Sequence, residues 1–223
     1  MNNKIVIIDY KLGNLFSIQN ALARIGQNCE ISSNSQQIAN ADALILPGVG
    51  SFKEAMNSLK HLDLINPLKD FINTGKPLLG ICLGFQLLFS ESEEFGHHQG
   101  LDVIEGKIKK FQPSNTLRVP HIGWNKLTIP NEKSWKKSPF KELKDNSMVY
   151  FVHSYYASVS NKNHILSNTT YDTITFPSSI MKDNIFATQF HPEKSGNIGI
   201  NILKNWALNY NIINPETKES VYE

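Results

Sequence analysis

The sequence predicts an α/β fold, in which a mostly parallel sheet is flanked by helices and followed by a largely antiparallel C-terminal extension. Two patterns predict it. In the first half of the chain, short apolar runs rich in β-branched residues alternate with segments of helical periodicity, which is the order of a doubly wound parallel sheet. In the second half, strand-like runs follow one another with turn residues between them, as in antiparallel sheets.

The first strand is expected over residues 4–9, "KIVIID", because an unbroken apolar run suits a strand buried on both faces. Residues 14–26 follow with apolar side chains at helical spacing, and Gly26 stands where a helix C-terminus needs it. Two further short strands are expected at 29–32, "CEIS", and 42–47, "DALILP".

The next elements continue the alternation. Helices are expected over 52–60 and 64–75, the second with a proline near its start and a glycine at its end. A fourth strand over 76–82 precedes a helix expected over 84–94, "GFQLLFSESEE".

The second half should consist of strands and one closing helix. The strands are expected in 103–111, 125–130, 147–159, 164–170, 175–182 and 185–190, and the helix over 197–210. The polar segment 131–147 is expected to be a surface excursion.

Composition narrows the possible functions. The 223 residues are 40% hydrophobic and 19% charged, as in ordinary globular proteins, and we expect one domain over 1–223 with its core at about 4–208. The net charge of +2 gives no nucleic-acid footprint, and no run approaches the ~18 apolar residues of a membrane span. The N-terminus lacks a secretory-signal pattern and two cysteines make no disulfide framework, so a cytoplasmic protein is expected.

The main chemical signal is the stretch "GICLGFQLLF". It places Cys82 between a predicted strand and a predicted helix, with Gly80 and Gly84 two residues away on either side, the pattern of a nucleophile elbow. At a helix N-terminus the dipole and the free N–H groups favour the reactive thiolate, and the N–H of Leu83 can point at an oxyanion. Taken alone, the motif fits equally well a small buried cysteine beside two packing glycines.

A nucleophilic cysteine needs a base and a group that orients the base. His191 is the best candidate, because it ends the strand of 185–190 in "HPEKSG". Residues i and i+2 of an extended strand share a face, so Glu193 should point the same way as His191. The combination of an elbow cysteine with a strand-end His-x-Glu outweighs a histidine in an ordinary turn, while His121 and His153 remain competing bases.

With these motifs in place, the chain resembles a family. The stretches "PGVGSF", "GICLGFQLLF" and "TQFHPEKSG", in this order, are similar to those of class I (triad-type) glutamine amidotransferases, whose sheet is flavodoxin-like. The stretches "IIDYKLGNLFSI", "PHIGWNKL" and "YFVHSY" narrow the resemblance to the glutaminase subunits of imidazole glycerol phosphate synthase, an enzyme of histidine biosynthesis. The resemblance covers about residues 5–206, nearly the whole chain.

The resemblance implies catalytic roles residue by residue. Cys82 resembles the nucleophile, His191 the base and Glu193 the acid that orients it. The backbone N–H groups of Val49 and Leu83 resemble the oxyanion hole, and the glycines of "PGVG" would let that peptide reorient. Cys29 matches no functional position and is expected to be a small buried hydrophobe.

The resemblance also implies residues that bind the substrate and a partner. The substrate-binding set is Gly48, Gly50, Gln86, Glu94, His153, Ser154 and Tyr155. Within it, Glu94 would meet the substrate ammonium group and residues 153–155 the substrate carboxylate, although a solvated acid and a polar strand end would look alike in sequence. The partner set is Asn14, Trp124, Asn125, Tyr150 and Lys194, with core packing as an equal alternative for Trp124 and Tyr150.

The implied reaction is hydrolysis of glutamine to glutamate and ammonia through a thioester, with no metal and no organic cofactor. Nothing in the sequence suggests a site that uses the ammonia, so a partner should receive it directly. In the resembled enzyme that partner is a (β/α)8-barrel cyclase, expected here in a 1:1 heterodimer, which makes imidazole glycerol phosphate and AICAR. The isolated chain should be a weak glutaminase, with the Val49 N–H turned away until a ligand-loaded partner shifts the turn.

Three alternatives remain. A cysteine-dependent α/β-hydrolase would share the elbow but would place its acid well before its histidine. The same glutaminase could supply ammonia for amidation of a bacterial surface sugar, because Lys11 stands where the resembled family mostly has glycine. A non-catalytic binding module is disfavoured by the intact Cys82, His191 and Glu193, and the other departure, Phe85 for a usual methionine, touches none of these three.

Overall fold

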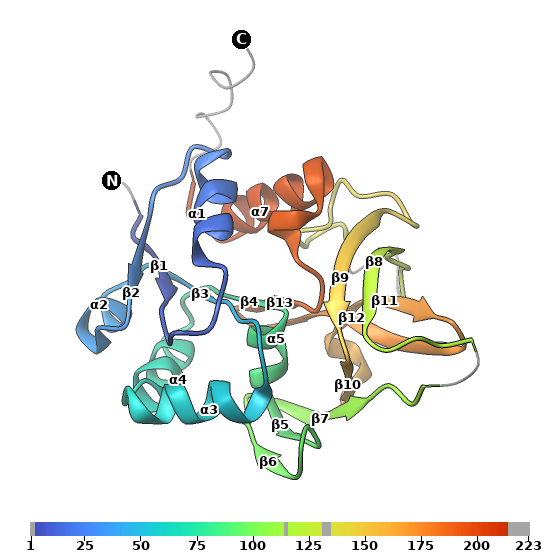
Figure 1. Cartoon of the computed structure of the whole chain (residues 1–223). Coiled ribbons are helices and arrows are strands. Elements are labelled where there is room, and N and C mark those ends of the chain that lie inside the picture. Colours follow the sequence, from blue (N-terminus) through green and yellow to red (C-terminus); the bar gives the residue numbers. More distant parts are fainter. Residues whose placement is uncertain (1–2, 114–115, 131–134, 214–223) are drawn as a thin grey trace.

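The structure is a computed structural model that describes residues 3–113, 116–130 and 135–213. Its central sheet contains β1 (Ile5–Ile8), β2 (Cys29–Ser32), β3 (Ala43–Leu46), β4 (Leu78–Ile81), β11 (Ile165–Tyr171), β12 (Ile174–Lys182) and β13 (Ile185–Thr188). The strands lie in the order β11-β12-β13-β4-β3-β1-β2 across the middle of the molecule (Figure 1). The five strands from β13 to β2 are parallel and β11 and β12 are antiparallel, which confirms the predicted fold class.

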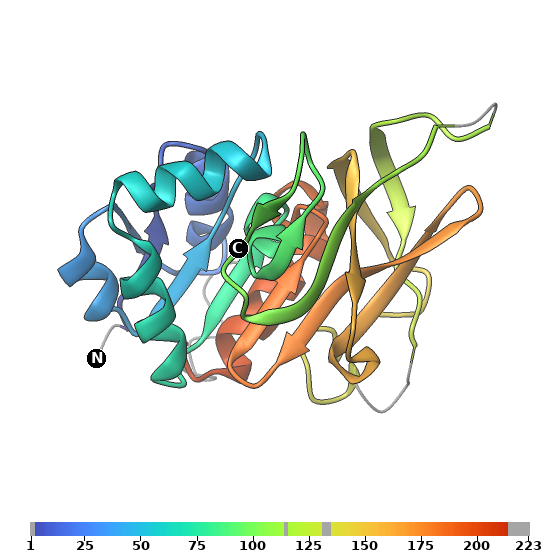
Figure 2. The ribbon, with the colours of Figure 1, turned by 90° about the horizontal axis from the view of Figure 1, so that it is seen from below.

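Helices cover both faces of this sheet (Figures 1 and 2). One face carries α1 (Leu15–Ala23) and α7 (Gly196–Asn209), and the other carries α2 (Ser35–Ala39), α3 (Phe52–His61), α4 (Ile65–Asn73) and α5 (Leu83–Leu87). In β1, Ile5 and Ile7 pack with α1 and α7, while Val6 and Ile8 pack with the helices of the other face. Successive side chains of a strand point to opposite faces, so an unbroken apolar run supplies both cores. In the described residues, every helix is too short or too polar to cross a membrane.

A smaller sheet and a hairpin stand beside the central sheet. The smaller sheet contains β5 (Phe89–Ser92), β6 (His98–Gln99), β7 (Ile104–Lys110) and β10 (Tyr155–Val159), in the order β10-β7-β5-β6. The hairpin pairs β8 (His121–Lys126) with β9 (Met148–His153) in antiparallel register. Since β9 and β10 meet at Ser154, the segment predicted as one strand over 147–159 is two strands in two different sheets.

The helix predicted over 84–94 is wrong in its second half. It ends at Leu87, and the following residues form β5, where Phe89 is fully buried and pairs with Ile104 of β7. Pairing with β7, which is distant in sequence, therefore overrides the helical pattern. The short helix α2 was not predicted at all.

Two further predictions in the second half need correction. The strand predicted over 125–130 begins earlier, as β8, and ends at Lys126. The described part of 131–147 is a surface excursion only in part, because Trp135 and Phe140 are buried in the core while most of the other residues are exposed. Trp135 Nε1 donates to the Leu166 carbonyl at 2.5 Å. Two large aromatic side chains gain free energy from burial, and their charged neighbours stay in water. Residues 131–134 lie outside the described part.

Candidate active site

Cys82 occupies a sharp turn between β4 and α5. Its backbone has φ 53° and ψ −105°, a conformation that residues other than glycine rarely adopt. The Cys82 amide donates to the Thr188 carbonyl at 2.8 Å, which ties the turn to the end of β13. The strained elbow predicted from the sequence is therefore present. The second cysteine, Cys29, is half-buried in β2, so the expectation of a buried side chain is only partly met.

The glycines beside Cys82 let the elbow pack directly on neighbouring backbone. A Cβ placed on Gly84 would lie 1.9 Å from the carbonyl oxygen of Leu46, at the end of β3. A Cβ on Gly80 would lie 3.0 Å from the Cβ of Ala187 in β13. The elbow can therefore form only with glycine at position 84.

His191 and Glu193 face one another, as their spacing predicts. Nδ1 of His191 lies 2.7 Å from Oε1 of Glu193, and both side chains are almost fully buried. His191 lies three residues beyond the end of β13 (Ile185–Thr188), as the residue that precedes the short 3-10 helix η2 (Pro192–Lys194), and Glu193 belongs to η2. The acid thus comes two residues after the histidine, which disagrees with the chain order of an α/β-hydrolase.

Ser195 fixes the turn that carries His191. Its hydroxyl donates to the His191 carbonyl at 2.7 Å and accepts from the Tyr150 amide at 3.0 Å. The His191 amide in turn donates to the Tyr150 carbonyl at 3.0 Å, so η2 is fastened to β9 at several points. Sequence reasoning missed this positioning role, because a serine ahead of the helical pattern of 197–210 only suggests a helix cap.

The charges at the elbow favour a protonated His191. Burial by itself lowers the pKa of this imidazole, but the Cys82 sulfur and the Glu193 carboxylate outweigh burial and raise the pKa to about 10. Nδ1 is committed to Glu193, so the proton on Nε2 is the one that can move. Nε2 is buried and makes no hydrogen bond of ordinary geometry to a described residue, and Cys82 is the charge that acts on it.

The predicted site residues gather around one hollow of about 320 Å³. It is lined by Val49, Gly50, Cys82, Leu83, Gln86, Glu94, Pro120, Val152, His153, Ser154, Tyr155 and His191. Two predicted residues stand behind this lining: Gly48 next to Val49 in the chain, and Glu193 on the far side of the His191 ring. Such a volume suits a free amino acid, while the roles assigned to the individual residues stay predictions.

The two predicted oxyanion donors do not converge in this structure. The Leu83 amide donates to the carbonyl oxygen of Gly48 at 3.4 Å. That carbonyl shares one planar trans peptide with the Val49 N–H, so the Val49 N–H points the opposite way. A Cβ on Gly48 would lie 2.2 Å from Oη of Tyr10, which donates to the Pro47 carbonyl at 2.6 Å. The turn thus has the orientation expected of a resting chain.

Gln86 and Glu94 supply acceptor oxygens to the hollow. Both hydrogens of Gln86 Nε2 are in use, one on the Tyr155 carbonyl at 3.1 Å and one on Gln189 Oε1 at 2.9 Å. Its Oε1 is therefore the atom left to accept from a ligand. Glu94 accepts from the Phe52 amide at 2.5 Å through Oε2, and burial raises the pKa of its carboxyl group. The two side chains together suit an ammonium group.

His121 and His153 form a chain of hydrogen bonds that uses all their ring nitrogens. Nδ1 of His153 donates to the Tyr155 carbonyl at 2.8 Å, because a carbonyl only accepts. Nε2 of His153 must then accept from Nδ1 of His121 at 2.9 Å, and Nε2 of His121 accepts from Asn125 at 3.3 Å. Burial lowers the pKa of His121 to about 4 and that of His153 to about 3. Both rings are therefore neutral and neither is a free base.

Replacing His121 by glutamine should reduce the loss of stability in acid. An unfolded histidine takes up a proton near pH 6.5, whereas the buried ring resists protonation down to pH about 4. The unfolded chain therefore binds more protons as pH falls below 6.5, and stability is lost at up to ~1.4 kcal/mol per pH unit and ring. We expect the free energy of unfolding in denaturant to fall less steeply from pH 7 to 4 in His121→Gln.

The control for this prediction is His61→Gln, because the His61 side chain is exposed. It should keep the slope of the unmodified chain. If stability falls equally steeply with pH in the unmodified chain and in both variants, the result contradicts a buried, neutral His121.

The predicted partner residues have varied surroundings. Trp124 is 52% exposed, so the alternative of core packing is wrong for it, and Tyr150 is half-buried with its ring 6.2 Å from that of Trp124. Asn14 is exposed and its side chain caps α1, while Lys194 is exposed in η2. Asn125 is half-buried and also donates to the Thr170 carbonyl at 3.0 Å.

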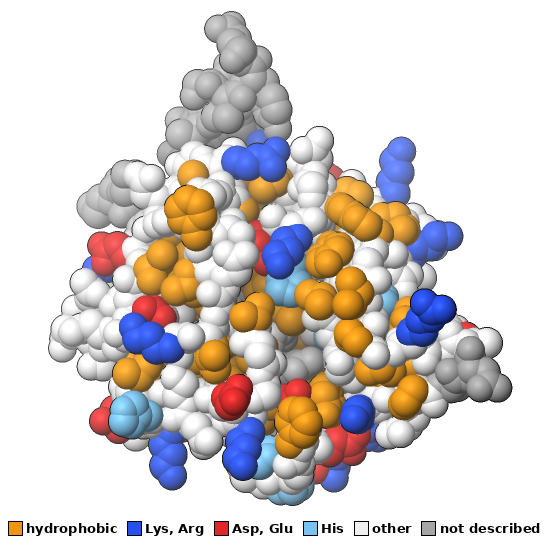
Figure 3. All heavy atoms as spheres, in the orientation of Figure 1, with side chains coloured by type: hydrophobic (Ala, Val, Ile, Leu, Met, Phe, Trp, Pro, Cys, Tyr) orange, Lys and Arg blue, Asp and Glu red, His pale blue; other side chains and the backbone are white. Residues whose placement is uncertain are grey.

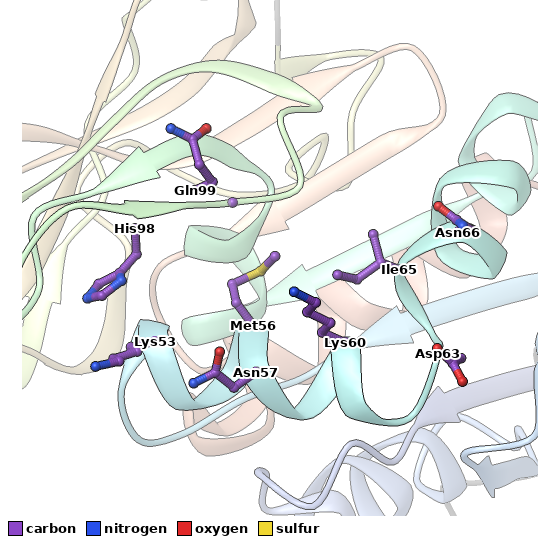
Figure 4. A pocket seen from close by; sticks show the side chains of 10 residues that line it. Lys53, Met56, Asn57, Lys60, Asp63, Ile65, Asn66, His98 and Gln99 are labelled. Carbon is purple, nitrogen blue, oxygen red and sulfur yellow. The ribbon is translucent and has the colours of Figure 1, made fainter.

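A second hollow, of about 560 Å³, lies outside this site, between α3 and β6 (Figure 4). Met56 and Lys60 point from α3 into it, and His98 and Gln99 border its other side. Its lining contains no cysteine and no His–Glu pair, so it does not share the chemistry of the elbow. Across the described parts of the chain, no three His, Cys, Asp or Glu side chains gather as a metal site would need.

Comparison with known proteins identifies the family of this chain. The family model "Glutamine amidotransferase class-I" matches residues 6–210. Imidazole glycerol phosphate synthase subunit HisH of Syntrophotalea carbinolica is 43% identical over 208 residues, which are 91% of this chain and 98% of that protein. The corresponding subunit of Cyanophora paradoxa is 46% identical over 203 residues, 91% of this chain and 93% of that one.

Solved structures with low sequence identity share the fold. A putative GMP synthase subunit from Thermoplasma acidophilum has a TM-score of 0.68 at 19% identity, over 95% of each chain. PurLQS from Thermotoga maritima has a TM-score of 0.69 at 16% identity, over 94% of this chain and 99% of that one. The family match and the close relatives together show that the chain belongs to the class-I glutamine amidotransferase family, among the HisH subunits of imidazole glycerol phosphate synthases.

Proposed function

We propose that the chain is the glutaminase subunit of an imidazole glycerol phosphate synthase and supplies ammonia to a cyclase partner in histidine biosynthesis. The observation that carries the proposal is the hollow in which Cys82 and His191 lie with Gln86 and Glu94. A nucleophile, a proton carrier and acceptors for an ammonium group are what hydrolysis of an amino-acid amide requires. The relatives at 43% and 46% identity support the pathway.

The first half of the proposed reaction forms a thioester. The Cys82 thiolate attacks the side-chain carboxamide carbon of glutamine, and negative charge develops on the carboxamide oxygen. His191, which holds its proton at neutral pH, gives the Nε2 proton to the leaving nitrogen. The C–N bond then breaks and releases ammonia.

The second half releases glutamate. His191, now neutral, takes a proton from water, and the hydroxide adds to the thioester carbon. The C–S bond breaks, and the thiolate and the protonated imidazole are restored. Glu193 stabilises the imidazolium and keeps Nε2 turned toward the sulfur in both halves.

The oxyanion needs two N–H donors. In the present orientation of the turn, one of them points away and the other is already hydrogen-bonded. The Leu83 N–H is bonded to the Gly48 carbonyl, and rotation of the Gly48–Val49 peptide would free it and bring the Val49 N–H alongside. Each tenfold gain in rate requires about 1.4 kcal/mol of preference for the rotated turn. Contacts with a ligand-loaded partner supply that preference in the proposed mechanism.

The surface supports a partner over the mouth of the site. Figure 3 shows hydrophobic side chains gathered on the face presented in Figure 1, over α1 and the β8–β9 hairpin. The exposed apolar side chains of these elements include Phe16 at 68%, Ile122 at 59% and Trp124 at 52%. Such a gathering of exposed apolar residues is typical of a protein interface. The single-domain organisation, the 1:1 stoichiometry, the barrel form of the partner and the cytoplasmic location stay predictions.

Lys11, on which the alternative of a sugar-amidating partner rested, makes local contacts in the structure. Its φ of 71° explains why glycine suits the position, and the strained backbone is offset by local bonds. The Lys11 amide donates to Asp9 Oδ1 at 2.9 Å, and its Nζ lies 3.0 Å from Asp9 Oδ2. These local bonds explain how a residue other than glycine is accommodated at this position.

The test is glutamate release from the chain alone, with the barrel cyclase, and with the cyclase plus its acceptor nucleotide or its product. We expect a weak rate alone and at least a tenfold rise with the ligand-loaded cyclase. Equal rates in all three would contradict activation of the Val49 turn by the partner. Stimulation by a sugar-amidating partner alone would move the protein to that other pathway.

A matched pair of variants tests the docking face. Trp124→Ala should weaken the stimulation by the cyclase, because its exposed ring would lose its contacts with the partner. Ile31→Ala should not, since Ile31 is similarly exposed, at 40%, but belongs to β2 at the far edge of the sheet. Equal effects of the two changes would place the partner elsewhere.

A further inference from the structure

Gln189 contacts the nucleophile, although no sequence pattern singled it out. It follows β13, is fully buried, and its backbone amide donates to the Ser178 carbonyl at 2.9 Å. Its side-chain Nε2 lies 3.8 Å from Sγ of Cys82, within reach of a hydrogen bond to sulfur. A polar side chain this deeply buried is stable only where its donors and acceptors are paired, so its partners indicate what it does.

The orientation of the Gln189 amide follows from its neighbours. The Tyr155 carbonyl can only accept, so the Gln86 atom 3.1 Å from it must be the donor Nε2. That same Nε2 lies 2.9 Å from Gln189, which must therefore present its acceptor, Oε1. The other end of the Gln189 amide, the donor Nε2, is then the one that faces Cys82. The Tyr155 carbonyl, at the other end of this series of hydrogen bonds, therefore fixes the direction of each bond.

A hydrogen-bond donor beside Cys82 stabilises the thiolate, which the short helix α5 does only weakly. The expected help from a helix dipole rested on a helix over 84–94, but α5 has only five residues, and a single short turn carries little dipole. The Val152 carbonyl lies 3.9 Å from Sγ and, as an acceptor, favours the protonated thiol. The positive charge of His191 and the N–H of Gln189 have the opposite effect and favour the thiolate.

We infer that Gln189 is a further catalytic residue: its amide donates to the Cys82 thiolate, and Gln86 holds it in the donating orientation. The inference rests on the proposed glutaminase function. Gln86 thus has two tasks, since its Nε2 orients Gln189 while its Oε1 remains for the substrate. Gln189 thus links the nucleophile to the substrate-binding side chain, with one hydrogen bond to Cys82 and one to Gln86.

The test measures the reactivity of Cys82 without glutamine or a partner. In a Cys29→Ala background, Cys82 is the only thiol, and its rate of alkylation by iodoacetamide is followed against pH. Gln189→Met keeps the length of the side chain but cannot donate, and Gln189→Glu keeps the acceptor toward Gln86 and loses the N–H. We expect both to move the midpoint of the alkylation profile up by about one pH unit, and so to slow alkylation by about tenfold at pH values below that midpoint.

Turnover should show the same effect. With the partner present, kcat should fall by about tenfold or more, and KM should change little because Gln189 contacts the sulfur rather than the substrate-binding atoms. The matched controls, Gln99→Met and Gln99→Glu on exposed β6, should leave the alkylation profile and kcat unchanged.

Unchanged alkylation profiles in folded Gln189 variants would overturn the inference and leave Gln189 as a packing residue. If both variants fail to fold, the inference is tested by NMR on the unmodified protein. The side-chain amide NMR signals of Gln189 should move in the pH range in which Cys82 gains reactivity, and signals that stay constant overturn it. If the Gln189 variants show the expected shift of the alkylation profile but the unmodified chain, with its partner, hydrolyses no glutamine, the result counts against the proposed function alone.

Discussion

Replacing Cys82 by alanine should abolish glutamate release. The side chain is the only nucleophile at the elbow, and without it no thioester can form. Cys82→Ser should be almost as inactive, because a hydroxyl has no appreciable population of anion at neutral pH. We expect a fall of at least ~10⁴-fold in kcat, measured as glutamate release with the ligand-loaded partner.

The control is the other cysteine. Cys29→Ala, in half-buried β2, should keep most of the activity. An electrophilic analogue of glutamine should label Cys82 and leave Cys29 untouched. Labelling of Cys29, or turnover that survives in Cys82→Ala, would contradict the assignment of the nucleophile.

Replacing His191 by asparagine should have the next largest effect, a loss of about 10²–10⁴-fold in kcat. It removes the group that protonates the leaving nitrogen and activates water. Glu193→Gln should cost less, because the ring keeps its backbone anchors at Tyr150 and Ser195 when the carboxylate is gone. Both losses are measured as kcat with the ligand-loaded partner.

His121 and His153 provide the comparison. Their rings are neutral and their nitrogens are committed to one another, to Asn125 and to the Tyr155 carbonyl. His121→Asn and His153→Asn should therefore lose much less kcat than His191→Asn. If either is as inactive as His191→Asn while folded and bound to its partner, the base is the wrong histidine.

The catalytic pair was predictable because its signals are local. A cysteine with glycines on both sides between a strand and a helix needs only a few residues, and His191 and Glu193 are only two apart. The expected extended backbone was wrong, because Glu193 lies in the 3-10 helix η2, but the two side chains meet all the same. The fold class was predictable for a similar reason, since three strands of the parallel sheet, β1, β3 and β4, are short runs that are fully buried and almost wholly apolar.

The rest depended on contacts that are distant in sequence. Gln189 has meaning only beside Cys82 and Gln86, each about a hundred residues away. Helical periodicity continued past Leu87, yet pairing of Phe89 with β7 made the next residues a strand. The burial of Trp135 against Leu166 likewise required knowing which strand would lie beneath a polar segment.

The bond between the Leu83 amide and the Gly48 carbonyl has a consequence for the chemical probes used on this chain. Iodoacetamide displaces its leaving group at a saturated carbon and places no charge on oxygen, so its reaction is blind to this bond. A glutamine-like chloroketone passes through a tetrahedral adduct whose oxygen requires the same two amides as the substrate. The ratio of the two inactivation rates therefore reports the position of the turn without any turnover. A compound that binds only the present orientation of the turn would stabilise the inactive chain. It would inhibit without resembling the transition state.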